Sequence, residues 1–399
     1  MESNIQSAET PLKVGDRITV EIGPIAHGGH FIARHKGQVV FVRYGITGEE
    51  AVVEITSTSS KLARGDAIEI LKPSKDRVVP PCKYAVPGGC GGCDFQHIEI
   101  SAQLELKRSV IREQFSRLGR IEMDLDVLPA EPINGLHWRT RMDFAISKNG
   151  KPGLYSARSK EVTEIDKCLI AVEAINDPAM FARSWKGDDR LEVAVSSSGE
   201  KNVSRGGRSI SGPTQLHEVV GEHTYQISPT SFWQSHSAAP KTLTKLVMDL
   251  MALRPGDQVC DLYGGVGLFT APMAEDVGDI GKVHLIESSH RATQDALKIF
   301  EKVKNVVVHA GRVEQKLPLI NRVDVILLDP PRTGAGDMVV KQIVAKKPRT
   351  IVYVSCDPAS LARDAKALEE AGYHLNHIVG FDLFPMTQHV ECVARFSLG

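Results

Sequence analysis

A cysteine between a predicted strand and a predicted helix is the first residue of this chain that could do chemistry. Residues 350–354 form an apolar, β-branched run that predicts a buried strand, and Cys356 stands just beyond it. Asp357 and Pro358 then open a helical pattern. The positive end of the helix dipole favours a thiolate there and predicts a lowered pKa. Ligands of open α/β sheets bind at the carboxyl ends of strands, so Cys356 is a candidate nucleophile, and a buried structural cysteine is the alternative.

An acidic residue begins the last apolar strand of the sequence. Glu391 stands at the start of the largely apolar run 390–398, where a carboxylate contributes little to packing. Near a thiol nucleophile, a carboxylate can serve as a general base. We therefore predict that Glu391 acts with Cys356.

A glycine-rich turn predicts a cofactor site. Residues 261–269 (DLYGGVGLF) follow a predicted strand and open a helix, and Gly265 lets the backbone turn tightly beside a ligand. Glu287 closes the next predicted strand, where an acid can accept hydrogen bonds from both ribose hydroxyls; an exposed strand-end acid is the alternative. The third small residue of a dinucleotide fingerprint is not obvious at residues 269–270. These features favour S-adenosylmethionine over NAD.

A second strand end carries a carboxylate and two prolines. Residues 327–334 (LLDPPRTG) end a predicted strand, and the prolines stiffen the exit so that Asp329 lies at the edge of the cofactor site. Amino-methyltransferases have a similar acid-Pro-Pro turn followed by an aromatic residue that stacks on the target base. Arg332 stands at that position here, so the same stacking is not predicted.

A nucleophilic thiol, a methyl donor and a base together define one reaction. Carbon 5 of uracil is too weakly nucleophilic to accept a methyl group unaided. Addition of a thiolate at carbon 6 makes the ring an enolate whose carbon 5 can attack the sulfonium methyl group. A base then removes the proton from carbon 5, and the thiolate leaves.

Three cysteines within twelve residues predict a metal site. Cys82, Cys90 and Cys93 lie in a glycine-rich segment, and Cys168 is the best remaining candidate for a fourth ligand. In a cytosolic protein such thiolates are more often metal ligands than disulfides. Spacing alone leaves open a structural zinc, an iron–sulfur cluster, or no metal.

Composition and length set the broad class of the protein. A chain of 399 residues should hold two or three domains, and a net charge of −1 gives no global sign of nucleic-acid binding. The polar segment from Met1 to Thr10 lacks the apolar core of a signal peptide, and no apolar run approaches a membrane span. We therefore predict a cytoplasmic protein with no membrane partner.

Strand and helix patterns divide the chain into three predicted domains. Residues 1–75 contain four or five short strands with glycine-rich turns, which suit a small all-β barrel of OB type. Residues 76–222 form a small mixed α+β central domain with the cysteines, and within them residues 187–215 carry no readable chemical signal. Residues 223–399 alternate strand and helix, which is typical of the doubly wound sheet of class I methyltransferases. The seven candidate strands are 258–263, 282–287, 305–310, 323–329, 350–356, 377–382 and 390–398.

Basic residues in two places suggest RNA contacts. An amphipathic helix over residues 101–120 has a basic face made of Lys107, Arg108, Arg112, Arg117 and Arg120. Residues 137–141 (HWRTR) interleave aromatic and arginine side chains, as in grooves that bind single-stranded RNA. Solvated surface is the alternative in both places. It is also the alternative for the cations of the barrel, which are Lys13, Arg17, Arg34, Lys36, Arg43 and Lys61.

Five motifs together resemble the TrmA/RumA family of S-adenosylmethionine-dependent RNA uridine C5-methyltransferases. They are residues 228–234 (SPTSFWQ), 261–267 (DLYGGVG), 329–334 (DPPRTG), 354–358 (VSCDP) and 389–391 (HVE). Residues 28–50 of the barrel resemble a TRAM domain, which implies RNA binding. The family implies a class I (Rossmann-like) fold, Cys356 as nucleophile and Glu391 as base. It also implies a cofactor site made of Gln234, Tyr263, Glu287 and Asp329, and a 4Fe-4S cluster on Cys82, Cys90, Cys93 and Cys168.

The sequence departs from the family pattern at three places. Leu268 stands where the best-known members have an asparagine, and Gly264 replaces a common cysteine. Seven residues separate Cys82 from Cys90, two more than the family spacing.

The combined prediction is a monomeric enzyme that makes 5-methyluridine in a structured RNA. The substrate is 23S rRNA by preference, as in the RumA branch, with tRNA as the other possibility. The alternatives are a methyltransferase for exocyclic amines of RNA and a non-catalytic RNA-binding factor.

Overall fold

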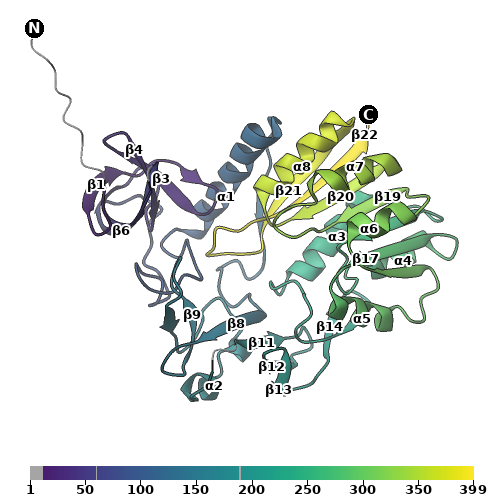
Figure 1. Cartoon of the computed structure of the whole chain (residues 1–399), viewed down its shortest axis with the longest axis horizontal. Helices are drawn as coiled ribbons and strands as arrows, with labels where there is room; N and C mark the ends of the chain where they lie inside the picture. Colours follow the sequence, from purple (N-terminus) through teal and green to yellow (C-terminus); the bar gives the residue numbers. More distant parts are fainter. Residues whose placement is uncertain (1–11, 60, 188–189) are drawn as a thin grey trace, which may run out of the picture.

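The computed structural model describes residues 12–59, 61–187 and 190–399 (Figure 1). The polar segment from Met1 to Thr10 lies outside the described residues. Figure 1 shows a small barrel on the left, a large sheet flanked by helices on the right, and a second sheet below and between them. No helix in the described part of the chain is long and apolar enough to cross a membrane.

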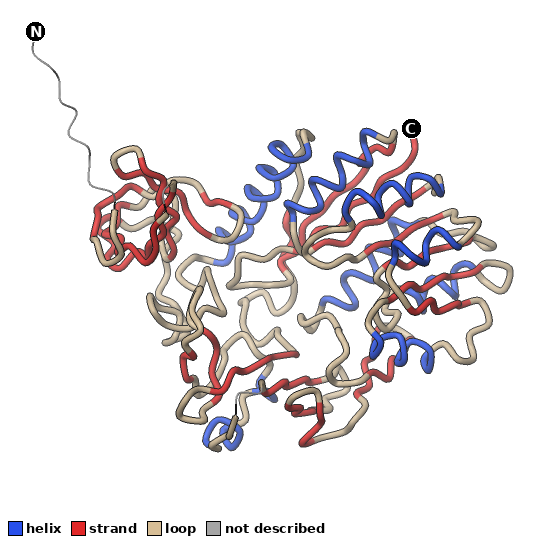
Figure 2. Tube along the Cα trace, in the orientation of Figure 1, coloured by secondary structure: helices blue, strands red, loops and turns tan. Residues whose placement is uncertain are grey.

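The barrel is a six-stranded sheet in the order β1-β5-β6-β4-β3-β2. Side chains alternate between the two faces of a strand, so Ile18 and Val20 of β1 point inward while their neighbours are exposed. Figure 2 shows these strands curled around a common interior, as predicted for an OB-type barrel. The strands are β1 (Arg17–Glu21), β2 (Ile25–Ala26), β3 (His30–His35), β4 (Gln38–Arg43), β5 (Glu50–Thr58) and β6 (Leu62–Lys72).

The central part contains an antiparallel sheet in the order β10-β9-β8-β11-β12-β13, followed by the hairpin β14-β15. Trp138, Phe144 and Leu191 are buried in its core. Its elements are β8 (Arg141–Ile146), β9 (Pro152–Tyr155), β10 (Val162–Glu164), α2 (Pro178–Ala182), β11 (Leu191–Val195), β12 (Lys201–Arg205), β13 (Arg208–Ser211), β14 (Leu216–Val220) and β15 (His223–Ile227).

The large sheet has the order β18-β17-β16-β19-β20-β22-β21-β7. Strands β16 to β20 are parallel, and β22 runs antiparallel to both of its neighbours. All seven predicted strands are present. Their bounds are β16 (Gln258–Leu262), β17 (Lys282–Glu287), β18 (Val306–Ala310), β19 (Val325–Leu328), β20 (Thr350–Ser355), β21 (Tyr373–Asp382) and β22 (Glu391–Leu398). This is the doubly wound methyltransferase sheet that the strand pattern predicts.

Helices cover both faces of this sheet and create two apolar cores. One core packs Val259, Leu327 and Val352 against α3 and α4, and the other packs Ile326 and Tyr353 against α7 and α8. The helices are α3 (Ala239–Met251), α4 (Thr270–Val277), α5 (His290–Ile299), α6 (Val313–Lys316), α7 (Gly336–Lys346) and α8 (Pro358–Glu370).

Two elements from the middle of the chain extend the large sheet. Strand β7 (Val127–Pro129) pairs with β21 at the edge of the sheet, and helix α1 (Ile100–Gln114) packs beside α8 (Figure 1). The sequence did not predict β7, because three residues are too few for a strand pattern.

Helix α1 does not carry the continuous basic face that its sequence predicts. Lys107 is 1% exposed and donates to Asp382 at the end of β21, with Nζ to Oδ1 at 2.5 Å. The expectation that Lys107 faces RNA is therefore wrong. Acidic partners also lie beside the remaining arginines of the described helix, since Arg108 and Arg112 contact Asp124.

The prediction of an RNA groove at residues 137–141 is also wrong for two of its residues. Trp138 is 1% exposed and stacks on His236, with ring centroids 5.3 Å apart. Arg141 donates to the buried Glu218 at 3.1 Å. Trp138 and Arg141 therefore make contacts inside the protein, and the interleaved aromatic and arginine pattern does not reveal this burial.

We expect the substitution Lys107→Met to lower the free energy of unfolding by about 3–5 kcal/mol, because it leaves Asp382 buried without its partner. The double variant Lys107→Met/Asp382→Leu should recover most of this loss, since it removes both buried charges. Urea denaturation would measure both effects. Arg112→Met, on the exposed side of the same helix, is the control and should change stability by less than about 1 kcal/mol. Equal destabilisation by the single and double variants would contradict the assignment.

Candidate active site

The register of the last strand places Cys356 opposite Glu391. Strands β20 and β22 are antiparallel and pair Ser355 with Cys392, so continuing this register by one position brings Cys356, just beyond β20, opposite Glu391. Side chains directly opposite each other in such a pair lie about 5 Å apart at Cβ. The two residues predicted as nucleophile and base are therefore neighbours, although 34 residues separate them in the chain.

Two further carboxyl groups share this side of the sheet. Because side chains alternate along a strand, Asp261 continues the row of Val259 on β16, and Asp329 continues that of Leu327 on β19. Cys356 continues the row of Val352 and Val354 on the same face. One thiol and three carboxyl groups thus gather on the face that α3 and α4 cover.

The predicted lowering of the Cys356 pKa is wrong for this structure. Burial raises the pKa of Cys356 to about 12, and the carboxyl groups of Glu391 and Asp329 add to the effect. Burial is the largest cause of this rise, and Asp357, which caps α8 by accepting the Ser360 N–H at 2.8 Å, adds a smaller contribution through its negative charge. Arg332 is the cation that opposes these effects.

Burial and mutual repulsion also keep protons on the acids. The pKa of Glu391 lies well above its usual range because the side chain is buried and Asp329 is nearby. Burial and the neighbouring Asp261 raise the pKa of Asp329 to about 7. A bound cation would reverse these shifts, because positive charge stabilises both carboxylates and the thiolate.

A small cavity lies at the carboxyl ends of β16 and β19. Its volume is about 30 Å³, and its walls include Gln234, Tyr263, Gly265 and Asp329, four of the five residues predicted at the cofactor. Gln234 Nε2 donates to Asp329 Oδ2 at 3.4 Å. The side of the cavity near the turn includes Leu268, where the family has an asparagine. Leu268 can make only apolar contacts with a ligand.

The fifth predicted residue, Glu287, is tied to the glycine turn. The N–H of Gly265 donates to Glu287 Oε2 at 3.1 Å, and the N–H of Ser289 donates to Oε1. The turn itself requires glycine at Gly267, where φ is 96° and a Cβ atom would meet the Phe300 ring at 2.3 Å. The geometry therefore holds the carboxylate of Glu287 beside the turn, as a ribose-binding acid requires.

The four predicted metal ligands line a second cavity of about 100 Å³ in the central part. Cys82, Cys90, Cys93 and Cys168 all contribute to its walls. Gln96 Nε2 lies 3.2 Å from the sulfur of Cys93 and donates to it. Among the described residues, no three His, Cys, Asp or Glu side chains meet closely enough to hold a single metal ion.

A turn of the barrel reaches the active site, which sequence reasoning did not find. Between β2 and β3, His27 Nε2 lies 3.1 Å from Asp357 Oδ2, next to Cys356. A Cβ atom on Gly29 would lie 2.5 Å from the side chain of Gln388, just before the segment that leads to Glu391. No local signal could identify these contacts, because 330 residues separate His27 from Asp357.

We expect His27→Ala to slow the predicted methyl transfer about tenfold, because loss of the contact lets Asp357 and the neighbouring thiol shift. Single-turnover methylation would measure the rate, and titration with S-adenosylmethionine should show unchanged affinity. His27→Gln should restore most of the rate, since its amide can still donate to Asp357. The control is His35→Ala, on strand β3 of the same barrel. A normal rate for His27→Ala would show that this contact does not position the nucleophile.

Comparison with known proteins agrees with this fold and site. The sequence profile of the tRNA (uracil-5-)-methyltransferase family matches residues 214–396, and that of the TRAM domain matches residues 11–68. An uncharacterized RNA methyltransferase of Streptomyces coelicolor is 41% identical, with 96% of this chain and 93% of that protein covered. One from Bdellovibrio bacteriovorus is 30% identical, with 100% and 99% covered.

A solved structure has the same fold. The tRNA (uracil-54, C5)-methyltransferase of Pyrococcus abyssi, in complex with S-adenosyl-L-homocysteine, superposes with a TM-score of 0.73 and 24% identity. The alignment covers 94% of this chain and 99% of the Pyrococcus chain.

The fold and the cavity at the glycine turn define a class I S-adenosylmethionine-dependent methyltransferase. The chain belongs to the TrmA/RumA family and is an RNA (uracil-C5)-methyltransferase with an amino-terminal TRAM domain.

Proposed function

We propose that this enzyme methylates carbon 5 of a specific uridine in a structured RNA through a covalent bond between Cys356 and carbon 6. The observation that carries the proposal is the closeness of Cys356 and Glu391: the register of β20 and β22 leads them to opposite positions, and the Glu391 carboxyl group acts on the pKa of Cys356. Asp329 links this pair to the cofactor cavity, because it lines the cavity and its charge acts on both residues. The target base must leave its stack to reach the thiol.

The residues of the chain have distinct roles in this mechanism. The Cys356 thiol loses its proton to solvent, and the thiolate sulfur bonds to carbon 6 while the electron pair of the carbon 5–carbon 6 double bond moves toward the carbonyl oxygen at carbon 4, so the pyrimidine becomes an enolate. S-adenosylmethionine supplies the methyl group that carbon 5 takes, and its sulfonium supplies positive charge at the cofactor site. That charge favours ionisation of Glu391, whose carboxylate then accepts the proton from carbon 5. The bond from carbon 6 to Cys356 breaks, and the thiolate leaves 5-methyluridine.

The cofactor site is formed by Gln234, Tyr263, Gly265, Glu287 and Asp329. In this arrangement the carboxylate of Glu287 accepts hydrogen bonds from the ribose hydroxyls, and the side-chain amide of Gln234 positions Asp329 through a hydrogen bond. Leu268 contributes apolar contact only.

The substrate we propose is 23S rRNA, with tRNA as the competing candidate. A TRAM domain together with a cysteine cluster resembles the RumA branch of the family, which supports the ribosomal substrate. We further propose that the enzyme is a cytoplasmic monomer with domains near 1–75, 76–222 and 223–399.

Mapping of 5-methyluridine tests the substrate. Total RNA from a strain that lacks the gene should lose 5-methyluridine at one or a few sites, and addition of the protein with S-adenosylmethionine should restore it. Loss of a site in 23S rRNA would support our choice, whereas loss of a site in tRNA would transfer the proposal to tRNA. An unchanged 5-methyluridine map would contradict uridine methylation by this protein.

We also propose that Cys82, Cys90, Cys93 and Cys168 hold a 4Fe-4S cluster. Thiolates are the usual ligands of such clusters, and a cavity of about 100 Å³ is larger than one metal ion needs. A structural zinc is the lesser possibility. The cluster would order the loop around Cys90, which lies against β9 through the pairing of Cys90 with Ser156.

Protein purified without oxygen should therefore contain iron and acid-labile sulfide, and Cys168→Ser should lose most of both. Metal analysis and sulfide analysis would measure these contents. Cys260→Ala removes a buried thiol of β16 far from the cluster loop in sequence and is the control, with iron retained. Stoichiometric zinc in the wild-type protein would overturn the cluster assignment.

A further inference from the structure

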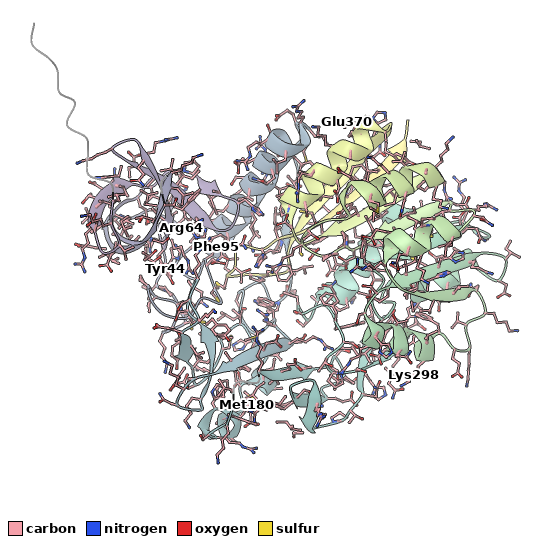
Figure 3. The ribbon with its side chains drawn as sticks, in the orientation of Figure 1. Tyr44, Arg64, Phe95, Met180, Lys298 and Glu370 are labelled. Atoms are coloured by element: carbon pink, nitrogen blue, oxygen red, sulfur yellow. The ribbon has the colours of Figure 1, made fainter. Side chains whose placement is uncertain are left out.

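Three cations gather where the barrel meets the central part. Arg43 and Arg64 lie on the outer faces of the neighbouring strands β4 and β6, and Arg158 reaches them from the turn between β9 and β10. Figure 3 labels Arg64 at this junction, close to Tyr44 and Phe95. Partial burial lowers the pKa of Arg158, and the positive charges of Arg64 and Arg43 lower it further, so three like charges lie close together here.

Carboxylates neutralise one of the three arginines. Arg43 lies 3.6 Å from Asp94, and Asp66 stands opposite Arg43 across β4 and β6. Within the described residues, Arg64 and Arg158 have no ion pair with an acid. Positive potential is therefore left over at this surface, and Arg158 is exposed to solvent.

Polar atoms without partners accompany this charge. Nε of Arg64 and Nε2 of His30 are both shielded from solvent and have no hydrogen-bond partner in the described structure. Leaving the Arg64 N–H unsatisfied costs free energy, which a bound acceptor such as a phosphate oxygen would recover. The His30 ring and the Arg64 guanidinium also flank Phe41, at 6.2 Å and 5.7 Å from its centroid. Arginines around an aromatic ring are typical of sites that track a nucleic-acid strand.

The same turn connects this cluster with the active site. His27 contacts Asp357, and His30 lies three residues further along, beside the arginines. Three residues span at most about 10 Å, so a strand entering the active site would pass close to the cluster. Because the substrate is an RNA, the anions available at this distance from the target base are backbone phosphates.

We propose that Arg64 and Arg158 bind a backbone phosphate of the RNA strand next to the target uridine, with the positive charge of Arg43 beside them. This inference rests on the proposed function, because it requires the target uridine to enter at Cys356. In this proposal, the surface where the barrel meets the central part fixes the RNA strand. The active site selects the base.

Measurement of RNA affinity against salt concentration tests the site. The probe is a purified RNA from the strain that lacks the gene. Either 23S rRNA or tRNA is used, according to which of the two the wild-type protein methylates. Arg64→Ala and Arg158→Ala should each weaken binding about three- to tenfold and reduce the slope of log K against log salt by about 0.7 to 0.9. Arg64→Lys and Arg158→Lys should retain most of the slope, because the positive charge remains.

Two controls make the test specific. Arg17→Ala removes an arginine of the same barrel that already pairs with Glu54 at 2.9 Å, and it should leave affinity and slope unchanged. The affinity for S-adenosylmethionine and the melting temperature should stay at wild-type values in all variants. A double variant Arg64→Ala/Arg158→Ala with wild-type affinity and slope would overturn the proposal. So would a loss of equal size in Arg17→Ala.

Covalent trapping separates this proposal from the proposed function. RNA that contains 5-fluorouridine should form a stable adduct with the wild-type protein, since fluorine cannot leave as a proton. If no RNA is trapped, the covalent mechanism fails. If trapping occurs while the arginine double variant binds RNA normally, only the phosphate site fails.

Discussion

Replacement of Cys356 by alanine should lower the rate of methyl transfer at least ~10⁴-fold, because carbon 5 of uracil loses the covalent activation that makes it nucleophilic. The variant should also form no covalent adduct with RNA containing 5-fluorouridine. Transfer of labelled methyl groups would measure the rate, and denaturing gel electrophoresis would detect the adduct. The fold should survive, since Cys356 lies at a partly exposed strand end.

A neighbouring thiol supplies the matched control. Cys392 pairs with Ser355, one position along from the catalytic pair, and is fully buried. Cys392→Ala should retain trapping and most of the activity. Adduct formation by Cys356→Ala would show that another group is the nucleophile, and unchanged methylation would indicate chemistry that needs no thiol.

Replacement of Glu391 by glutamine should separate bond formation from product release. The amide cannot take the proton from carbon 5, so turnover should fall about 10²- to 10⁴-fold. The enzyme should then accumulate as a covalent complex with ordinary, unfluorinated RNA in the presence of S-adenosylmethionine. Denaturing electrophoresis followed by mass spectrometry would identify the methylated nucleotide bound at Cys356.

The same substitution should change the ionisation of the thiol. When it is ionised, Glu391 is the largest charge that raises the pKa of Cys356, and a bound sulfonium favours that ionisation, so in the cofactor-bound enzyme Glu391→Gln should lower the pKa of Cys356. Because a lower pKa leaves more thiolate at a fixed pH, alkylation of Cys356 by iodoacetamide in the presence of S-adenosylmethionine should become faster in the variant. Glu287→Gln is the contrast: it should weaken cofactor binding without accumulating an adduct. Normal turnover in Glu391→Gln would assign the base to another residue.

The sequence predicts best what depends on neighbouring residues. The apolar runs at Lys282–Glu287 and Thr350–Ser355 define their strands almost to the residue, because buried parallel strands have a strong local pattern. Cys356 and Glu391 are also readable, since each stands at the end of such a run. The motif resemblance adds Gln234, which no local chemistry would have selected.

The sequence fails where distant parts of the chain determine the environment of a residue. Lys107 looks like an exposed helical cation, but its partner Asp382 is 275 residues away. The helix dipole at Cys356 is a local effect, whereas burial by other parts of the chain raises the pKa of Cys356, and Glu391 and Asp329 from other strands add to the rise. His27 has no motif at all, because its role depends on how the barrel packs against the large sheet.

Strand β22 lies between β20 and β21, and this order matters for how the enzyme is made. It is the last strand of the chain, and it inserts into a gap between two strands that are already synthesised. Until β22 is in place, β20 and β21 each lack one of their two neighbours in the sheet. A nascent chain at that stage holds a thiol without its base and two unpaired edges. Insertion of β22 therefore pairs both edges and brings Glu391 to Cys356 in a single event.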